Sequence, residues 1–207
     1  MLPAPPKIMC CPKCEQRFLQ HELMSGNTFG ASFYSDGKME APMLPEFPQF
    51  SRCPSCGTFF WVNDLKCQGV TNFGDCSYPD IEELTIAEIA LFLECGPVRK
   101  PDEELFVRVK LWHAFGDRVR MGSGDKMFES PEEQALWEGN LRRILELHPE
   151  EKLLIAEIHR QLGEFDEAIQ ILDEVLAEKK ESLTIAAEMK AHCERKNRQV
   201  FRFEEDE

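Results

Sequence analysis

The sequence contains no apolar run of about 20 residues, which is the length that a helix needs to cross the hydrocarbon core of a bilayer. Its first ten residues, Met-Leu-Pro-Ala-Pro-Pro-Lys-Ile-Met-Cys, also lack the continuous apolar stretch of a secretory signal. Both absences argue against a membrane-spanning or exported protein. We therefore expect a soluble protein of the cytoplasm.

Positive charge is also scarce, because the 207 residues include 24 basic and 38 acidic side chains, for a net charge of −14. Residues 1–76 hold six basic and seven acidic side chains, whereas residues 77–207 hold 18 and 31. A protein that binds nucleic acid non-specifically uses Lys and Arg to displace counterions from phosphates. Neither half has a net positive charge, so nucleic acid is a poor partner, and anionic membranes should repel the acidic half.

The motifs of common enzyme classes are missing. We find no glycine-rich phosphate-binding loop, no G-x-S-x-G and no H-E-x-x-H. The five histidines form no motif with a nucleophile, and His113 reads as a partly buried residue of a helix. The sequence therefore predicts a protein that is not an enzyme, with no catalytic residue and no organic cofactor.

Cysteine, in contrast, is abundant and unevenly placed. Seven of the nine cysteines precede residue 77, and the odd total excludes complete internal pairing. Clustering at fixed local spacing is typical of metal ligation rather than of a secreted disulfide framework. Two short segments, Cys11–Cys14 and Cys53–Cys56, are near copies with the pattern Cys-Pro-x-Cys.

The spacing within each pair predicts its chemistry. Two intervening residues put both sulfurs on one side of a tight turn, where backbone N–H groups can hydrogen-bond the thiolates. Proline fixes φ at the second position, and Gly57 tolerates the positive φ that often follows the second ligand. Two such turns supply a closed tetrahedral zinc site with no open position. We predict that one structural Zn²⁺ ion is bound by Cys11, Cys14, Cys53 and Cys56.

The paired CPxC turns, each followed by an aromatic residue, resemble a zinc ribbon, specifically the prokaryotic CpXC-type domain, over roughly residues 8–65. The resemblance implies β-hairpins around a structural zinc ion, in a family whose role is uncharacterised. Two features depart from it: 38 residues separate the pairs, and Glu15 stands where glycine commonly follows the first turn. Such sites contribute about 10–16 kcal/mol in zinc peptides, so metal binding should decide whether this small domain folds.

Several alternatives stay open. A Cys-Pro-x-Cys pair can be a redox dithiol, although thioredoxin-like proteins place one pair before a helix and neither pair here opens one. Iron bound as in rubredoxin uses the same two turns, and one pair could be merely structural. Nucleic-acid binding by the ribbon would need a basic patch formed by Lys7, Lys13, Arg17, Lys38, Arg52 and Lys66.

The other cysteines carry weaker signals. Cys10 could take the place of its neighbour in a shifted register, and Cys67 and Cys76 could form a second, partial metal site or be spare thiols. Cys95 and Cys193 fall within expected helices and read as core residues.

The chain changes character near residues 77–80. Before this point we expect short strands, including Thr28–Tyr34, ended by an Asp36-Gly37 turn, and Phe59–Val62. After it we expect about six helices with strong capping signals. The expected ranges are 86–94, 102–115, 130–147, 149–162 and 183–195, with another helix whose inward face runs from Phe165 to Val175. A loop is expected over 116–129 and a disordered acidic tail over 204–207.

Residues 149–182 resemble one tetratricopeptide repeat (TPR). The residues that carry the resemblance are Ala156, His159, Gly163, Phe165, Ala168, Leu172 and Val175, and Leu162–Ile169 is the most specific run. The expected inward face of the first helix is Leu154, Ile155, Ile158 and Leu162. A single repeat is too small to be stable alone, so it should pack on neighbouring helices, on the zinc domain or on another subunit. It implies either a peptide-binding groove or a plain packing scaffold.

Together these patterns predict an α+β protein with two domains. Residues 1–76 form a β-hairpin zinc ribbon with a long insertion between its cysteine pairs, and residues 77–207 form an α-helical TPR-like domain. The predicted function is a non-enzymatic, zinc-binding interaction or adaptor protein with a protein partner. The sequence leaves the oligomeric state open.

Overall fold

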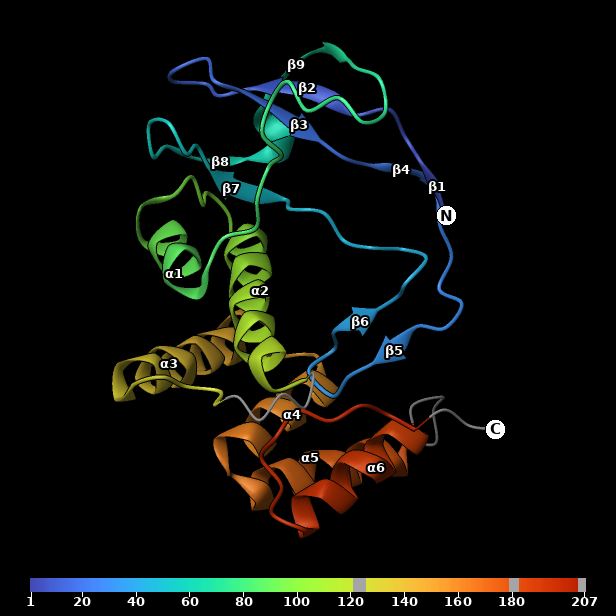
Figure 1. Ribbon diagram of the computed structural model, residues 1–207. Coiled ribbons are helices and arrows are strands. Elements are labelled where there is room, and N and C mark those ends of the chain that lie inside the picture. The colour runs from blue at the N-terminus through green and yellow to red at the C-terminus, as the bar shows by residue number, and fades with distance from the viewer. Residues whose placement is uncertain (121–125, 179–182, 205–207) are drawn as a thin grey trace. The chain divides into compact units, whose positions relative to one another are not determined.

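The computed structural model describes residues 1–120, 126–178 and 183–204. They fall into two compact units (Figure 1). The first unit, which we call the strand unit, comprises residues 1–31 and 40–99. The second, the helical unit, comprises residues 32–39 and the chain from residue 100 onward. The chain therefore contributes to the helical unit twice, first through a short hairpin and later through a long run of helices.

Short antiparallel strands and one helix make up the strand unit. Strand β2 lies between β3 and β9 in a three-stranded sheet, β7 pairs with β8, and β1 pairs with β4. The elements are β1 (Leu2–Pro3), β2 (Lys7–Cys10), β3 (Arg17–Gln20), β4 (Leu23–Ser25), β7 (Phe50–Arg52), β8 (Phe59–Trp61), η1 (Val62–Asp64), β9 (Lys66–Val70) and α1 (Ile86–Cys95).

Aromatic packing explains why α1 belongs to the strand unit. Phe92 of α1 is fully buried, and its ring centroid lies 4.7 Å from that of Phe50 and 5.4 Å from that of Trp61. The Trp61 indole also donates a 3.0 Å hydrogen bond to the carbonyl of Pro97, just beyond the helix. The sequence predicts a domain boundary between residues 76 and 77, whereas the compact units divide between residues 99 and 100.

The helical unit contains the pair β5 (Ser32–Phe33) and β6 (Met39–Glu40), whose last residue already belongs to the strand unit, and five helices. The helices are α2 (Pro101–Arg120), α3 (Pro131–Leu147), α4 (Lys152–Leu162), α5 (Phe165–Ala177) and α6 (Leu183–Glu194). With α1, the described residues therefore hold the six helices that we expected. Helix α2 runs five residues past the expected end, and α4 begins three residues late.

The caps of these helices follow the sequence signals. Thr85 and Glu88 form a reciprocal capping box at the start of α1, and Ser130 caps α3 ahead of Pro131. Gly163 ends α4 in the left-handed conformation with φ of 86°. These local interactions satisfy backbone groups that the helix itself leaves unpaired, which is why the helix starts were predictable.

The apolar core of the last three helices also matches the expected pattern. Ala156 of α4 and Ala168 and Leu172 of α5 are fully buried, and they share one cluster with Met189 and Cys193 of α6. The expected inward face of α4 is wrong in part. Ile158 is fully buried, but Leu154, Ile155 and Leu162 are half-buried. The buried face of α4 instead includes three polar residues: Glu157, Arg160 and Gln161.

The described structure is therefore a mixed α+β protein, with small antiparallel strands first and helices after them. The expected strand over 28–34 is reduced to β5, and Phe59–Val62 forms β8 and the start of η1. Residues 121–125 of the expected loop, which include Gly122-Ser123-Gly124, and residues 205–207 of the acidic tail lie outside the described residues. No helix within the described ranges is both long enough and apolar enough to span a membrane.

Candidate metal centre

Each Cys-Pro-x-Cys segment forms the tip of a β-hairpin. Cys11–Cys14 connects β2 to β3, and Cys53–Cys56 connects β7 to β8. The two tips repeat the same backbone hydrogen bonds. The first cysteine of each pair donates its N–H to the residue five positions later, over 2.8 Å to Gln16 and 2.9 Å to Thr58. The sequence copies are therefore also copies in backbone structure.

The residue after each pair has a positive φ. Gly57 has φ of 71°, and Glu15 at the equivalent position has φ of 61°. Both donate their N–H back to the carbonyl of the first cysteine, over 2.8 Å for Gly57 and 3.1 Å for Glu15. Glutamate in this conformation is strained, because its Cβ crowds the backbone. The departure from glycine in the first turn therefore leaves the turn geometry intact at a cost in backbone energy.

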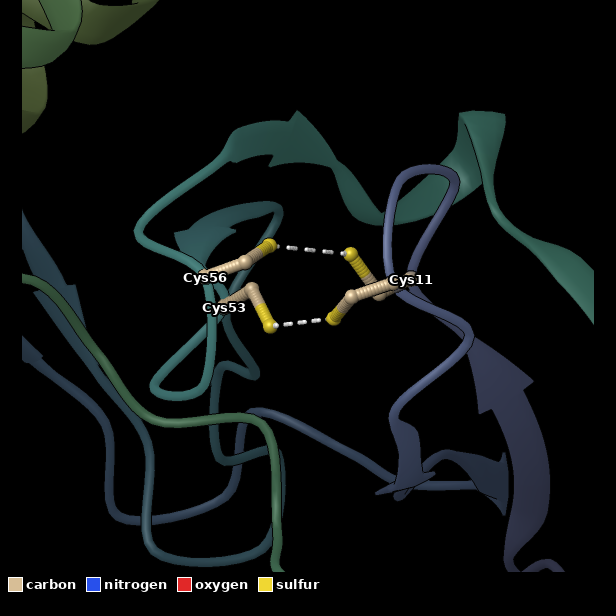
Figure 2. A group of neighbouring side chains, drawn as sticks. Cys11, Cys53 and Cys56 are labelled. Atoms are coloured by element: carbon tan, nitrogen blue, oxygen red, sulfur yellow. Dashed lines mark hydrogen bonds between the residues drawn. The ribbon is translucent and has the colours of Figure 1, made fainter.

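The two turns bring four sulfurs together. The Sγ atoms of Cys11, Cys14, Cys53 and Cys56 all lie within 4.8 Å of one another. Cys11 Sγ lies 3.7 Å from Cys56 Sγ, and Cys14 Sγ lies 3.5 Å from Cys53 Sγ, so each close pair joins the two turns (Figure 2). These distances are far longer than a disulfide bond. All four residues are free cysteines.

This arrangement fits a tetrahedral metal ion. Zinc–sulfur bonds of about 2.3 Å set the sulfurs of a regular tetrahedron about 3.8 Å apart. The two close sulfur pairs are 3.7 and 3.5 Å apart, so a zinc ion would fit between the four thiolates with little adjustment. A complete set of four sulfurs leaves no position for substrate or catalytic water. A metal ion in such a centre has a structural role. Four thiolates can also bind iron.

The cluster is buried on one side and open on the other. Cys11 and Cys53 are buried, Cys56 is half-buried and Cys14 is exposed. The buried sulfurs pack in an apolar cluster with Phe18 and Phe60, whose ring centroids lie 5.7 Å apart. These two aromatic residues lie shortly after the two turns in sequence. Part of this small unit's core is therefore built on the cysteines themselves.

The local environments shift the thiol pKa values in opposite directions. Burial raises the pKa of Cys53 to about 12 and also raises that of Cys11. A hydrogen bond with the Thr58 hydroxyl, 3.2 Å away, lowers the pKa of Cys56 to about 6. Thr58 was not recognised from the sequence. Its only signal is its place two residues after the last cysteine.

Backbone N–H groups oppose the effect of burial on the two inner thiols. The N–H groups of Lys13 and Cys14 hydrogen-bond Cys11 and lower its pKa. Those of Ser55 and Cys56 do the same for Cys53. Donors of this kind stabilise the thiolate form that a metal requires. This agrees with the expectation that backbone N–H groups in each turn hydrogen-bond the thiolates.

The remaining cysteines stay outside this cluster. Cys10 is buried beside Cys11, with its thiol 3.7 Å from the Cys11 carbonyl, so the register is the expected one. Cys67 and Cys76 are exposed, and no second group of metal-binding side chains occurs among the described residues. Cys193 is buried as expected, whereas Cys95 is exposed, so its assignment to the core was wrong.

The six basic residues considered for nucleic-acid binding are divided between the units. Lys38 belongs to the helical unit, where it contacts Asp117 at 2.5 Å. Lys7 pairs with Glu22 at 2.6 Å, and Arg52 pairs with Glu88 at 2.5 Å. Three of the six basic residues are therefore paired with carboxylates, and one of these three lies outside the strand unit.

Comparisons with known proteins give no family to which the site could be assigned. No protein-family model matches the chain, and neither a curated protein nor a solved structure matches it significantly.

Proposed function

We propose that this chain is a non-enzymatic adaptor protein whose strand unit is a zinc ribbon, held together by one structural Zn²⁺ ion. The observation that carries the proposal is the convergence of four cysteine sulfurs from two hairpin tips to within 4.8 Å. The ligands in this proposal are Cys11, Cys14, Cys53 and Cys56. Zinc is favoured over iron because it is the usual ion of closed four-cysteine sites in small structural domains.

The proposed role as an adaptor is supported by the helical unit. Helices α4, α5 and α6 pack through small residues, with Ala156, Ala168 and Ala186 fully buried, as a TPR-like arrangement requires. A groove of about 450 Å³ lies in this unit. Its lining is mainly apolar and includes Phe33, Leu153, Leu154, Ile185, Met189 and Phe203. In the proposed function, this groove receives an apolar segment of a protein partner in the cytoplasm.

Native mass spectrometry combined with elemental analysis tests the metal centre. The protein purified without chelator should carry one zinc ion per chain, and acid or chelator should remove it. Iron in place of zinc would show a different ion in the same site. Absence of any transition metal would refute the proposal.

Thiol titration separates the metal centre from a redox dithiol. Zinc-bound thiolates should react with a thiol reagent only as the metal is released, whereas a redox pair would react without metal loss. A coincident release of metal and four thiols supports the structural role. Rapid reaction of two thiols in a metal-free protein would instead favour thiol redox chemistry.

Peptide selection tests the groove. Peptides selected on the intact protein from a random library should lose binding to Ile185→Asp, since Ile185 lines the groove and is 39% exposed. Leu91→Asp is the matched control, because Leu91 is similarly exposed on α1 of the strand unit. Equal binding to both variants would remove the groove from the proposed function.

A further inference from the structure

The hairpin of residues 32–39 is an integral part of the helical unit, although it lies between the two cysteine pairs in sequence. Asp36 at its turn forms a bidentate ion pair with Arg120 of α2, with contacts of 2.7 and 3.0 Å. Both side chains are only 1% exposed. The Arg120 guanidinium also lies over the Tyr34 ring, 4.5 Å from its centroid. The hairpin is thus anchored by a buried charge pair.

Helix α2 is adapted to this anchor at Gly116. A Cβ at this position would lie 2.7 Å from the Arg120 guanidinium and 3.2 Å from the Asp36 carboxylate. Glycine in a helix interior costs about 1 kcal/mol relative to alanine. Its presence in α2 therefore fits a need for space at the ion pair.

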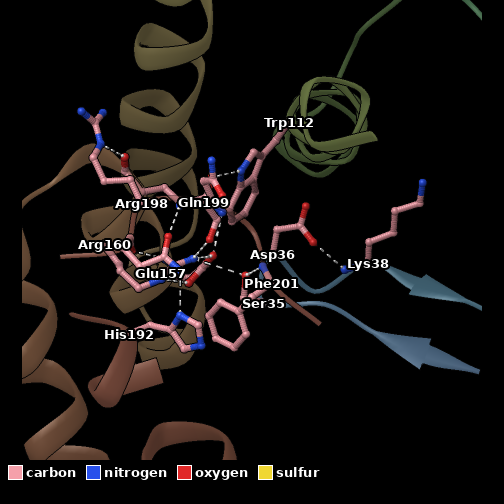
Figure 3. Close-up of polar contacts among 12 residues, drawn as sticks. Ser35, Asp36, Lys38, Trp112, Glu157, Arg160, His192, Arg198, Gln199 and Phe201 are labelled. Carbon is pink, nitrogen blue, oxygen red and sulfur yellow. Dashed lines mark hydrogen bonds and ion pairs between the residues drawn. The ribbon is translucent and has the colours of Figure 1, made fainter. Parts of the chain in front are cut away.

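A second anchor joins the hairpin to α4 and to the segment after α6. Arg160 and Glu157 are fully buried and pair at 2.6 Å, and Arg160 also reaches the Ser35 hydroxyl at 3.4 Å (Figure 3). The same guanidinium donates to the Gln199 carbonyl at 3.0 Å. Backbone bonds from Ser35 to Phe201 and from Phe203 to Phe33, both 2.9 Å, complete the join.

The connections of the hairpin link it to the metal centre. It leaves and re-enters the strand unit between Cys14 and Cys53. While that unit is folded, the ends of the hairpin and the start of α2 are all held by one folded body. If the strand unit unfolds, residues 40–99 become a flexible loop of 60 residues, and docking of the hairpin on the helical unit must close this loop. The entropic cost of closing a flexible loop grows with the logarithm of its length, so the docking equilibrium weakens when the strand unit unfolds.

We propose that the hairpin makes the stability of the helical unit depend on the metal centre, so that metal loss releases the hairpin and loosens α2, α4 and the segment 197–203. This inference rests on the proposed function, because it needs a metal that folds the strand unit. Release leaves Arg120 with Asp117 as its remaining carboxylate partner and deprives Arg160 of its Ser35 contact. A buried charge that loses a partner is destabilising. Metal loss therefore acts on the helical unit, which contains the proposed partner groove.

Hydrogen exchange on the full-length protein, before and after chelator treatment, tests this coupling. Metal removal should speed amide exchange at least tenfold in β2 and β3, and also in the last turns of α2 and in 197–203. In Asp36→Asn, which weakens the hairpin anchor, the zinc-loaded protein should already exchange faster in 197–203. Metal removal should then add less than threefold there. Asp173→Asn is the matched control, since Asp173 pairs with Lys190 at the surface of the same unit.

The outcomes separate the coupling from the metal centre. Fast exchange confined to the strand unit after metal removal would overturn the coupling and leave the proposed zinc ribbon standing. If the protein holds no metal, or if amide exchange in the strand unit stays slow after metal removal, the proposed function is overturned. The proposed dependence of the helical unit on the metal is then overturned as well. Phe60→Asp then tests the hairpin alone, since it disrupts the strand-unit core and alters no cysteine. Unchanged amide exchange in residues 197–203 of that variant would show that the hairpin does not couple the helical unit to the folding of the strand unit.

Discussion

Exchanging the residues after the two cysteine turns should move metal affinity in opposite directions. Gly57 and Glu15 occupy equivalent positions with φ of 71° and 61°. A non-glycine residue in this conformation costs about 1–2 kcal/mol. Gly57→Ala incurs this cost, and a Cβ at that position would contact nothing within 4 Å, so no clash adds to it. Stiffening of the unfolded chain offsets roughly 0.4–1 kcal/mol. The net destabilisation is about 1 kcal/mol.

Because folding of the strand unit is expected to be coupled to metal binding, this change should appear as weaker zinc affinity. A loss of about 1 kcal/mol is about fivefold in the dissociation constant. Glu15→Gly should tighten affinity by a similar factor, since it removes the strain from the first turn. The assay is competition for zinc between the protein and a chromophoric chelator at fixed pH.

Two controls isolate the backbone effect. Glu15→Gln removes the charge and keeps a side chain, so it should change affinity by less than Glu15→Gly does. Gly139→Ala makes the same chemical change as Gly57→Ala on the exposed face of α3, again with open space around the new Cβ. It should raise helix stability and leave zinc affinity unchanged. Tighter binding by Gly57→Ala, or equal effects of the two Glu15 variants, would refute the strained-turn argument.

Three further predictions test other parts of the protein. Cys14→Ser should abolish retention of zinc under chelator challenge in native mass spectra, whereas Cys67→Ser, at an equally solvent-facing cysteine of β9, should retain it. Hydrogen bonding from Arg143 lowers the pKa of Glu104 to about 2, so its ion pairs add stability that is present above pH 4.5 and lost as the pH falls toward 2. Glu104→Gln should therefore cost about 1 kcal/mol in urea unfolding at pH 7, and the difference from wild type should vanish in acid; a constant difference would contradict this. Arg160→Met leaves the Glu157 carboxylate buried without its charge partner and should lower the free energy of unfolding by about 3–5 kcal/mol. Arg142→Met, in the more exposed pair with Glu164, should lower it by less than about 1 kcal/mol. Similar thermal shifts for the two arginine variants would argue against a stabilising role for the buried pair.

The sequence alone determined the features that depend on local chemistry. The Cys-Pro-x-Cys spacing identified four cysteines that the structure brings together, because two-residue spacing fixes a tight turn whatever follows it. Helix starts at Thr85 and Ser130 were also predictable, since a capping side chain bonds backbone groups only three residues away. The end of α4 at Gly163, which has the left-handed conformation, was predictable for the same reason, because it depends on local residues. The mixed α+β character followed from these local patterns.

Other features were decided by contacts between residues far apart in the chain. Nothing near Asp36 or Arg120 in the sequence indicates that they pair across 84 positions, because Asp36 falls in an expected turn and Arg120 in the expected loop over 116–129. Glu157 and Arg160 pair within α4, but Arg160 also bonds Ser35 and the Gln199 carbonyl, which are far from it in sequence. Burying a polar residue is costly unless it has hydrogen-bond or charge partners, and Asp36 and Arg160 each have such a partner in another part of the chain. The membership of the 32–39 hairpin in the helical unit was therefore decided by the tertiary structure alone.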